Sequence, residues 1–182
     1  VVYDALGTPA LGEAMRVAIR KVTAQPIRRI VVGHYHADHI YGLQAFVAVG
    51  ATIVAHPAAR EYLASDTAQR RLESSRQELF PWIDESTRLV LADQWLAGDD
   101  STLRVGGQEF RIRHVGPAHT PEDLVVFLPK SGVLFAGDLV FRGRIPFVGQ
   151  ADSRQWIDSL NRLIGFAPRL LIPGHGPVSH TP

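Results

Sequence analysis

Three histidines and one aspartate lie within six residues, and this density of metal-binding side chains is the strongest chemical signal in the chain. The stretch reads His34-Tyr35-His36-Ala37-Asp38-His39. Imidazole and carboxylate groups are common ligands of zinc and similar divalent metals. In an extended or turning loop, His34 and His36 point to one side and can hold one ion. Asp38 and His39 follow the turn and can hold a second ion, so the motif predicts a metal site.

Three more candidate ligands each follow a run of residues with strand-like hydrophobicity. His119 follows residues 110–115, Asp138 follows residues 133–135, and His175 follows residues 170–172. Binding sites in α/β proteins form beyond the carboxyl ends of the strands. The chain has no cysteine, so any metal must be held by nitrogen and oxygen atoms. These positions predict a site to which several strand ends contribute ligands.

The elements that must position these ligands alternate between strand-like and helical patterns, which predicts one α/β domain over residues 1–182. Helices are expected after Thr8-Pro9, at 43–49, within 57–80 and from Asp152 onward, where Gln155 fits a capping box. Strands are expected at 1–4, 27–32, 52–55, 103–105, 110–115, 124–128, 133–135 and 170–172. The apolar stripes of the first and last helices comprise Leu11, Met15, Ala18, Ile19, Val22, Trp156, Leu160, Leu163 and Ile164.

Composition and charge narrow the class of partner. The chain is 46% hydrophobic and 20% charged, with a formal net charge of +1, so no strong field favours nucleic acid or a membrane surface. No apolar run approaches the roughly 20 residues that a membrane span needs. We therefore expect a small-molecule substrate, no nucleic acid and no membrane, with the oligomeric state left open. The absence of cysteine fits a bacterial periplasm or cytoplasm equally well, so the compartment is also left open.

In this order, the metal-binding motifs resemble those of the metallo-β-lactamase superfamily, the glyoxalase II-like hydrolases, over nearly the whole chain. The motifs are H-x-H-x-D-H, a later histidine, Gly137-Asp138 and Gly174-His175. The resemblance implies an αββα sandwich, here lacking part of the first strands and of the C-terminal end. It also implies two Zn²⁺ ions, with iron or manganese as other metals of this fold. The implied ligands are His34, His36 and His119 for the first metal, Asp38, His39 and His175 for the second, and Asp138 as a bridge between them.

The resemblance further implies a reaction. A hydroxide that bridges the two metals would attack an ester, thioester, lactone or amide, a β-lactam included. Asp38 would act as the catalytic residue that orients the hydroxide or relays its proton. Local sequence around residues 33–45, 116–121 and 137–149 is similar to a bacterial subgroup that is associated with quinoprotein and sulfur-oxidation gene neighbourhoods. One departure is Glu122, where the family often has glycine after His-Thr-Pro.

Two other functions remain open at this point. An iron-dependent sulfur dioxygenase of the same fold holds a single iron with two histidines and one aspartate. The presence of His36 and His39 completes a two-metal set here, which favours hydrolysis. A non-catalytic binding protein that kept the fold is the third hypothesis.

Several residues outside the implied ligand set are also assigned roles. Tyr41, Arg142 and Arg144 border the motifs and are candidates for binding substrate, the arginines through a carboxylate or phosphate. His56, His114 and His180 are interpreted as structural, and Asp4 as a residue that bonds the backbone of a loop. The aromatic residues Trp82, Trp95 and Phe147 are interpreted as core or interface.

Overall fold

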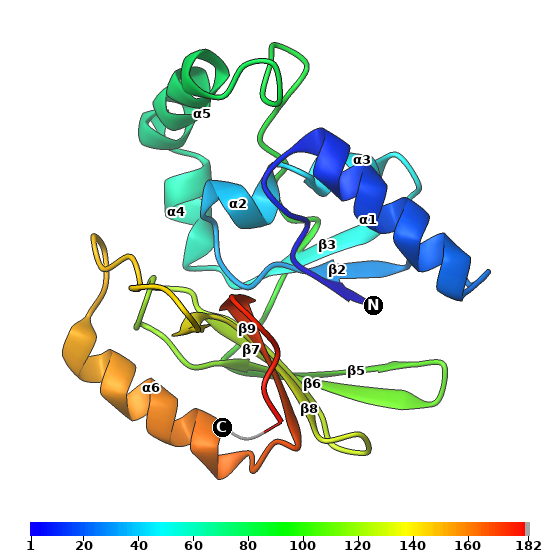
Figure 1. Ribbon diagram of the computed structural model, residues 1–182, viewed down its shortest axis with the longest axis vertical. Helices are drawn as coiled ribbons and strands as arrows, with labels where there is room; N and C mark the ends of the chain where they lie inside the picture. Colours follow the sequence, from blue (N-terminus) through cyan, green and yellow to red (C-terminus); the bar gives the residue numbers. More distant parts are fainter. Residues whose placement is uncertain (181–182) are drawn as a thin grey trace. The chain divides into compact units, whose positions relative to one another are not determined.

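A computed structural model describes residues 1–180 of the chain, which divides into two compact units, Val1–Trp95 and Leu96–Pro182. Each unit contains one β-sheet with its own helices (Figure 1), so the prediction of a mixed α/β fold is confirmed. The prediction that the chain forms one domain stays a prediction. Among the described residues, no helix combines the length and apolar character that a membrane crossing requires.

The first unit is built on a four-stranded parallel sheet with the strand order β1-β2-β3-β4. The strands are β1 (Val2–Tyr3), β2 (Arg29–Val31), β3 (Thr52–Ala55) and β4 (Gln94–Trp95). Parallel neighbours need crossover connections, and helices supply them. These helices are α1 (Pro9–Val22), α2 (Ala37–Ile40), α3 (Leu43–Val47), α4 (Ala59–Leu63) and α5 (Asp66–Glu78).

Local capping signals set the helix ends in this unit. The Thr8 side chain accepts a hydrogen bond from the Leu11 N–H at 3.1 Å, and Pro9 occupies the first turn of α1. Residues 57–80 form two helices, because Ser65 starts a new one by accepting from the Ala68 N–H at 3.3 Å. Met15 and Ile19 pack on the core, where α1 lies beside α3 (Figure 1). Leu11 and Val22 are exposed, so the apolar stripe of α1 is narrower than predicted.

The second unit is built on a five-stranded sheet with the order β5-β6-β7-β8-β9. The strands are β5 (Asp100–Val105), β6 (Gln108–His114), β7 (Leu124–Leu128), β8 (Val133–Phe141) and β9 (Leu170–His175). Neighbours from β5 to β8 are antiparallel, and β8 and β9 are parallel, joined by α6 (Ser153–Gly165). Gly106 and Gly107 both have positive φ, which a two-residue hairpin turn between β5 and β6 requires.

Helix α6 packs on β8 and begins at the predicted residue (Figure 1). The Asp152 side chain accepts hydrogen bonds from the N–H groups of Arg154 and Gln155 at 3.1 and 2.9 Å. The Gln155 side chain donates to the Asp152 carboxylate, so it supports the capping residue rather than its backbone. Trp156 and Leu163 are buried as predicted, but Leu160 and Ile164 are exposed, which corrects the predicted stripe.

The strands β8 and β9 are longer than the sequence predicted. β8 continues to Phe141, with irregular register beside β9 between Phe135 and Gly137 and again before Phe141. Asp138 therefore lies within a strand and not after one.

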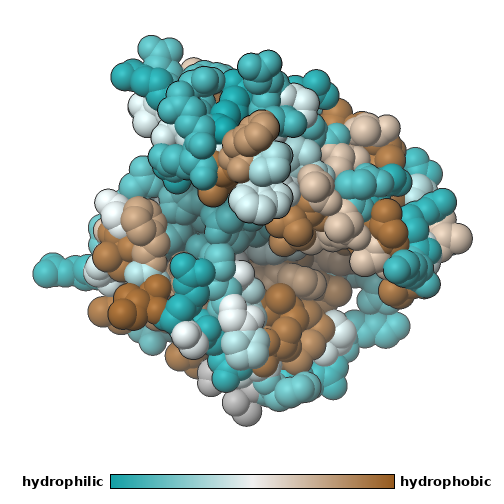
Figure 2. Space-filling model, turned by 45° about the horizontal axis from the view of Figure 1, so that its top comes forward, coloured by the Kyte–Doolittle hydropathy of each residue, from teal (hydrophilic) through white to brown (hydrophobic). Residues whose placement is uncertain are grey.

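Large apolar side chains also reach the surface, and Figure 2 shows groups of hydrophobic residues among hydrophilic ones. Trp82 is 66% exposed and Phe147 is 58% exposed, so neither belongs to the core, and their interpretation as interface residues stays a prediction. Trp95 is half-buried and packs against the core of the first unit.

Removal of the cap on α6 should destabilise the second unit. We expect Asp152→Ala to lower the Tm by roughly 2–4 °C, because two backbone N–H groups lose their acceptor. Hydrogen bonding from the Gln155 N–H lowers the pKa of Asp152, so the folded state prefers the carboxylate. The difference in Tm between Asp152→Ala and the unchanged chain should therefore become smaller as the pH falls through that pKa. Asp158→Ala, an exposed change on the same helix, is the control in calorimetric melting, and an equal effect of both variants would contradict the capping role.

Candidate metal centre

In the first unit, the chain after β2 brings the residues of the H-x-H-x-D-H motif together. The imidazole rings of His34 and His36 have centroids 4.7 Å apart, and those of His34 and His39 are 4.2 Å apart. Nε2 of His39 lies 3.5 Å from an oxygen of Asp38. His36 is the residue before α2, so Asp38 and His39 belong to the single turn of this helix, after the extended segment that holds His34. His34 and His39 are buried, whereas half of the Asp38 side chain is exposed.

Asp4 fixes the orientation of His39. One carboxylate oxygen of Asp4 accepts a hydrogen bond from the Gly33 N–H at 2.6 Å, and the other lies 2.7 Å from Nδ1 of His39. Since Nδ1 is engaged by a carboxylate, Nε2 is the nitrogen of His39 that can serve as a metal ligand. The sequence predicted the contact of Asp4 with loop backbone but missed its contact with His39. In the sequence, the only indication of this contact was the position of Asp4 at the end of a predicted strand.

A close approach of backbone to side chain explains Gly33. A Cβ atom at this position would lie 2.7 Å from Cζ of Tyr3 and 3.2 Å from a carboxylate oxygen of Asp4. Any larger residue would therefore collide with the Tyr3 ring and crowd the carboxylate of Asp4.

In the second unit, one carboxylate stands between two imidazoles. Oδ2 of Asp138 lies 3.4 Å from Nε2 of His119 and 3.4 Å from Nε2 of His175. His119 comes from the loop after β6, Asp138 from β8 and His175 from the end of β9. Asp138 and His119 are buried, and His175 is partly exposed. This arrangement is what a carboxylate that bridges two metals would need.

The backbone around Asp138 is shaped to admit this carboxylate. A Cβ atom at Gly174 would lie 2.8 Å from the backbone nitrogen of Asp138 and would also collide with its side chain. The sequence correctly singled out Gly174 as part of a motif, and the structure supplies the physical reason: the carboxylate occupies the space in front of the glycine.

Asp123 supports the loop that carries His119. Its carboxylate accepts hydrogen bonds from the N–H and the hydroxyl of Thr120, each at 2.8 Å. Burial raises the pKa of Asp123 to about 6, although the hydrogen bonds from Thr120 act in the opposite direction. Sequence reasoning missed this residue. The signal was the spacing of three residues between Thr120 and Asp123, at which a side chain can close a turn.

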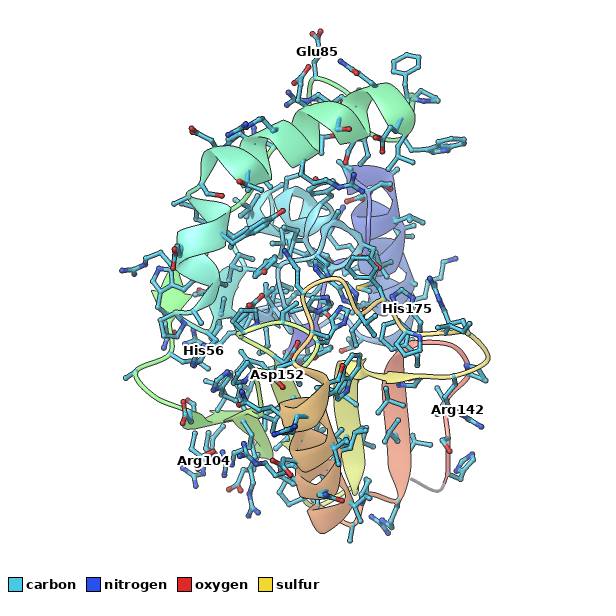
Figure 3. All side chains as sticks on the ribbon, turned by 90° about the vertical axis from the view of Figure 1, so that its left-hand side faces the viewer. His56, Glu85, Arg104, Arg142, Asp152 and His175 are labelled. Carbon is cyan, nitrogen blue, oxygen red and sulfur yellow. The ribbon has the colours of Figure 1, made fainter. Side chains whose placement is uncertain are left out.

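The predicted substrate-binding residues occupy three different environments. Tyr41 is only 2% exposed and belongs to the core of the first unit. Arg142 lies next to the segment after β9 (Figure 3), where its Nη1 donates to the carbonyls of Pro177 and Val178. Arg144 is exposed, and its Nη1 lies 3.5 Å from Nδ1 of His175. Their contact with substrate stays a prediction.

The other histidines have local contacts. Nδ1 of His56 accepts from the Ala58 N–H at 3.3 Å. His114 lies 3.3 Å from a carboxylate oxygen of Asp99, and its second nitrogen donates to the carbonyl of Pro121 at 2.9 Å. Both histidines also belong to residue groups that could hold a metal ion, so the interpretation of His56, His114 and His180 as structural stays a prediction.

The donor chemistry fits a bound metal. Within each unit, the described side chains offer imidazole nitrogens and carboxylate oxygens, which suit zinc and also iron or manganese. Ligand atoms of His34 and His36, of Asp38 and His39, and of Asp138 with each of its histidine neighbours lie within 4.8 Å of one another. Each unit therefore carries a group of donors close enough to share an ion.

Comparison with protein families agrees with these donors. The model of the metallo-β-lactamase superfamily matches residues 1–175. The linear primary-alkylsulfatase of a Pseudomonas species is 26% identical, over 88% of this chain and 36% of that protein. Metallo-β-lactamase IND-1 of Chryseobacterium indologenes is 25% identical, over 100% of this chain and 71% of that protein. The 2,4-dinitroanisole O-demethylase subunit alpha of a Nocardioides species is 24% identical. The chain spans about a third to a half of the length of this relative and of the alkylsulfatase.

Solved structures show the same fold. A metallo-β-lactamase from Pontibacter korlensis superposes with a TM-score of 0.77 at 24% identity, over 97% of this chain and 74% of that one. A second related structure, described as a di-iron-bound form, has a TM-score of 0.72 at 24% identity, over 98% of this chain and 82% of that one. The predicted fold is confirmed, and the named relatives are bacterial proteins, as expected for this chain.

The contact between Asp4 and His39 makes a prediction for metal affinity. We expect Asp4→Ala to weaken zinc binding about 10- to 100-fold, because His39 loses the partner that fixes its ring. Asp4→Asn keeps an oxygen for the Gly33 N–H but turns an NH2 donor toward Nδ1 of His39, so it should also weaken zinc binding. Competition with a chromophoric chelator measures the affinity, with the exposed change Glu61→Gln as the control. Unchanged zinc affinity in folded Asp4→Ala would show that Asp4 does not orient a ligand.

Proposed function

The chain belongs to the metallo-β-lactamase superfamily, and from this premise we propose that it is a hydrolase with a binuclear metal centre, for which zinc is the first candidate. Its substrate would be a small molecule with an ester, thioester, lactone or amide bond. The named relatives include metallo-β-lactamases and an alkylsulfatase, so the proposal lies within the chemistry of this family.

The position of Asp138 is the observation that carries the proposal. A carboxylate oxygen at 3.4 Å from two imidazole nitrogens is well placed to bridge two ions, each also held by one of those histidines. We assign His119 to the first metal together with His34 and His36. We assign His175 to the second metal together with Asp38 and His39. Iron remains the alternative metal, supported by the related structure in a di-iron-bound form.

When bound, the metal ions would supply Lewis acidity and generate a hydroxide nucleophile near neutral pH. The residues of the chain would then determine orientation and proton transfer. Asp4 holds the His39 ring by its Nδ1, so that Nε2 keeps a fixed direction. Asp123 holds the Thr120 backbone and thereby the loop of His119.

Asp38 is the residue that we assign to proton transfer. Its side chain is 52% exposed, so its carboxylate can contact a water molecule or substrate, unlike the buried Asp138. One of its oxygens lies 3.5 Å from Nε2 of His39, which keeps the carboxylate beside a proposed ligand. Asp38 would accept a proton from the attacking water and pass it to the leaving group.

Metal removal and return tests the proposed function. We expect the zinc-loaded protein to hydrolyse at least one of a generic thioester, a lactone and a chromogenic β-lactam. Chelation should abolish the activity and added zinc should restore it, because the nucleophile depends on the metals. Asp138→Ala should bind fewer than two zinc ions per chain, measured by elemental analysis, and should lose most activity.

Asp158→Ala is the control for this experiment, since it removes an exposed carboxylate from the same unit. Two zinc ions retained in Asp138→Ala would contradict the bridging role. A single iron per chain, together with oxygen uptake and no hydrolysis, would contradict the hydrolase proposal and would indicate an enzyme that catalyses oxidation.

A further inference from the structure

Helix α6 is bonded at two points to the loop that carries His119. The N–H of Asp152, the residue that precedes α6 (Figure 3), donates to the carbonyl of Ala118 at 2.9 Å. Further along the helix, the Ser159 hydroxyl donates to the carbonyl of Val115. Ala118 and Ser159 are buried, so these hydrogen bonds are shielded from water. The helix therefore holds the segment directly before His119 in place.

Trp156 lies between these two contacts, on the same face of α6. Positions 152, 156 and 159 are separated by four and three residues, which is the spacing of one helix face. The indole Nε1–H of Trp156 donates to the carbonyl of Leu139 at 3.0 Å, and Leu139 directly follows Asp138. The indole also packs against the His119 ring, with centroids 5.5 Å apart and planes inclined by 61°. One buried side chain thus contacts a proposed metal ligand and the backbone beside another.

The hydrogen bond from Trp156 reaches β8 at a place where the sheet pairs irregularly. β8 pairs with β7 over residues 133–135, and its register with β9 is interrupted between Gly137 and Phe141. Irregular pairing disrupts the ladder of backbone hydrogen bonds and redirects the side chains of the strand. Asp138 and Leu139 belong to this irregular part. A donor from α6 therefore gives the backbone next to Asp138 a fixed point that the regular ladder does not supply.

The ring of His119 is enclosed by aromatic side chains. The Phe141 ring lies 5.7 Å from the His119 ring and 6.4 Å from the Trp156 ring, measured between centroids. Close packing of this kind restricts rotation of the imidazole. Nε2 of His119 lies 3.4 Å from Oδ2 of Asp138, and a metal held by both atoms would require this separation to be kept. Trp156 contacts the structure on both sides of that pair.

We propose that Trp156 is a positioning residue of the metal centre, which holds His119 by ring packing and the backbone beside Asp138 by its indole N–H. The inference rests on the proposed function, because it takes His119 and Asp138 as metal ligands. Groups that orient a ligand without touching the metal change metal affinity about 10- to 100-fold when they are replaced. Trp156 also belongs to the core of the second unit, so a test has to separate loss of packing from loss of ligand geometry.

Zinc titration of the full chain, in competition with a chromophoric chelator, measures the effect of Trp156. We expect Trp156→Phe, which keeps a ring but loses the indole N–H, to raise the zinc Kd about tenfold. Trp156→Leu loses both contacts and should raise the Kd further. Leu163→Ala is the matched control, because Leu163 is buried in the same core about two turns further along α6. The cavity that it leaves should lower the Tm, whereas the zinc Kd should stay unchanged.

Replacement of zinc by Co²⁺ gives a readout that a loss of stability alone does not change. The visible absorption bands of bound Co²⁺ depend on the arrangement of its ligands. We expect Trp156→Phe to shift these bands, because His119 and Asp138 would no longer be held at the same separation. Leu163→Ala should keep the spectrum of the unchanged chain.

The outcomes separate this inference from the proposed function. An unchanged zinc Kd in folded Trp156→Phe overturns the inference, and so does an unchanged Co²⁺ spectrum. A rise of the zinc Kd in Leu163→Ala equal to that in Trp156→Phe also overturns it, because general destabilisation would then explain both. An unchanged chain that binds no zinc would contradict both proposals. A zinc affinity that depends on Trp156, in a protein that hydrolyses none of the three test substrates, would support the inference and refute the hydrolase proposal alone.

Discussion

The carboxylate of Asp138 is the group on which the proposed site depends. It is buried, and one of its oxygens faces the imidazoles of both His119 and His175. A carboxylate in this position is costly without a compensating positive charge, and bound metal ions would supply that charge. Gly174 leaves the space that the side chain occupies, and Asp123 holds the loop from which His119 projects. The second unit is thus organised around one anionic group.

Much of the fold could be predicted because its boundaries have local causes. The start of α1 at Thr8-Pro9, the start of α6 at Asp152 and the turn at Gly106-Gly107 all follow from capping or from positive φ. The extension of β8 to Phe141 could not be predicted in this way, since it depends on pairing with β9. Exposure of Leu160 and Ile164 was missed because periodicity defines a helix face but not how much of it is covered.

The candidate site also contains features that could be predicted from the sequence and features that could not. The side chains with metal-binding chemistry could be identified from residue types, order and family resemblance, and within each unit the structure brings them close together. Their role as ligands stays a prediction. Contacts such as that of Asp4 with His39 join residues far apart in the chain and leave no pattern in the sequence. The sequence also could not distinguish Arg142 from Arg144, since only the surrounding carbonyls and rings do so.

Anomalous X-ray diffraction from crystals of the zinc-loaded protein, collected at the zinc absorption edge, tests whether Asp138 bridges two metal ions. We expect two strong anomalous peaks about 3.5–4 Å apart, both in contact with the carboxylate of Asp138. A single peak, or two peaks of which neither contacts Asp138, would contradict it.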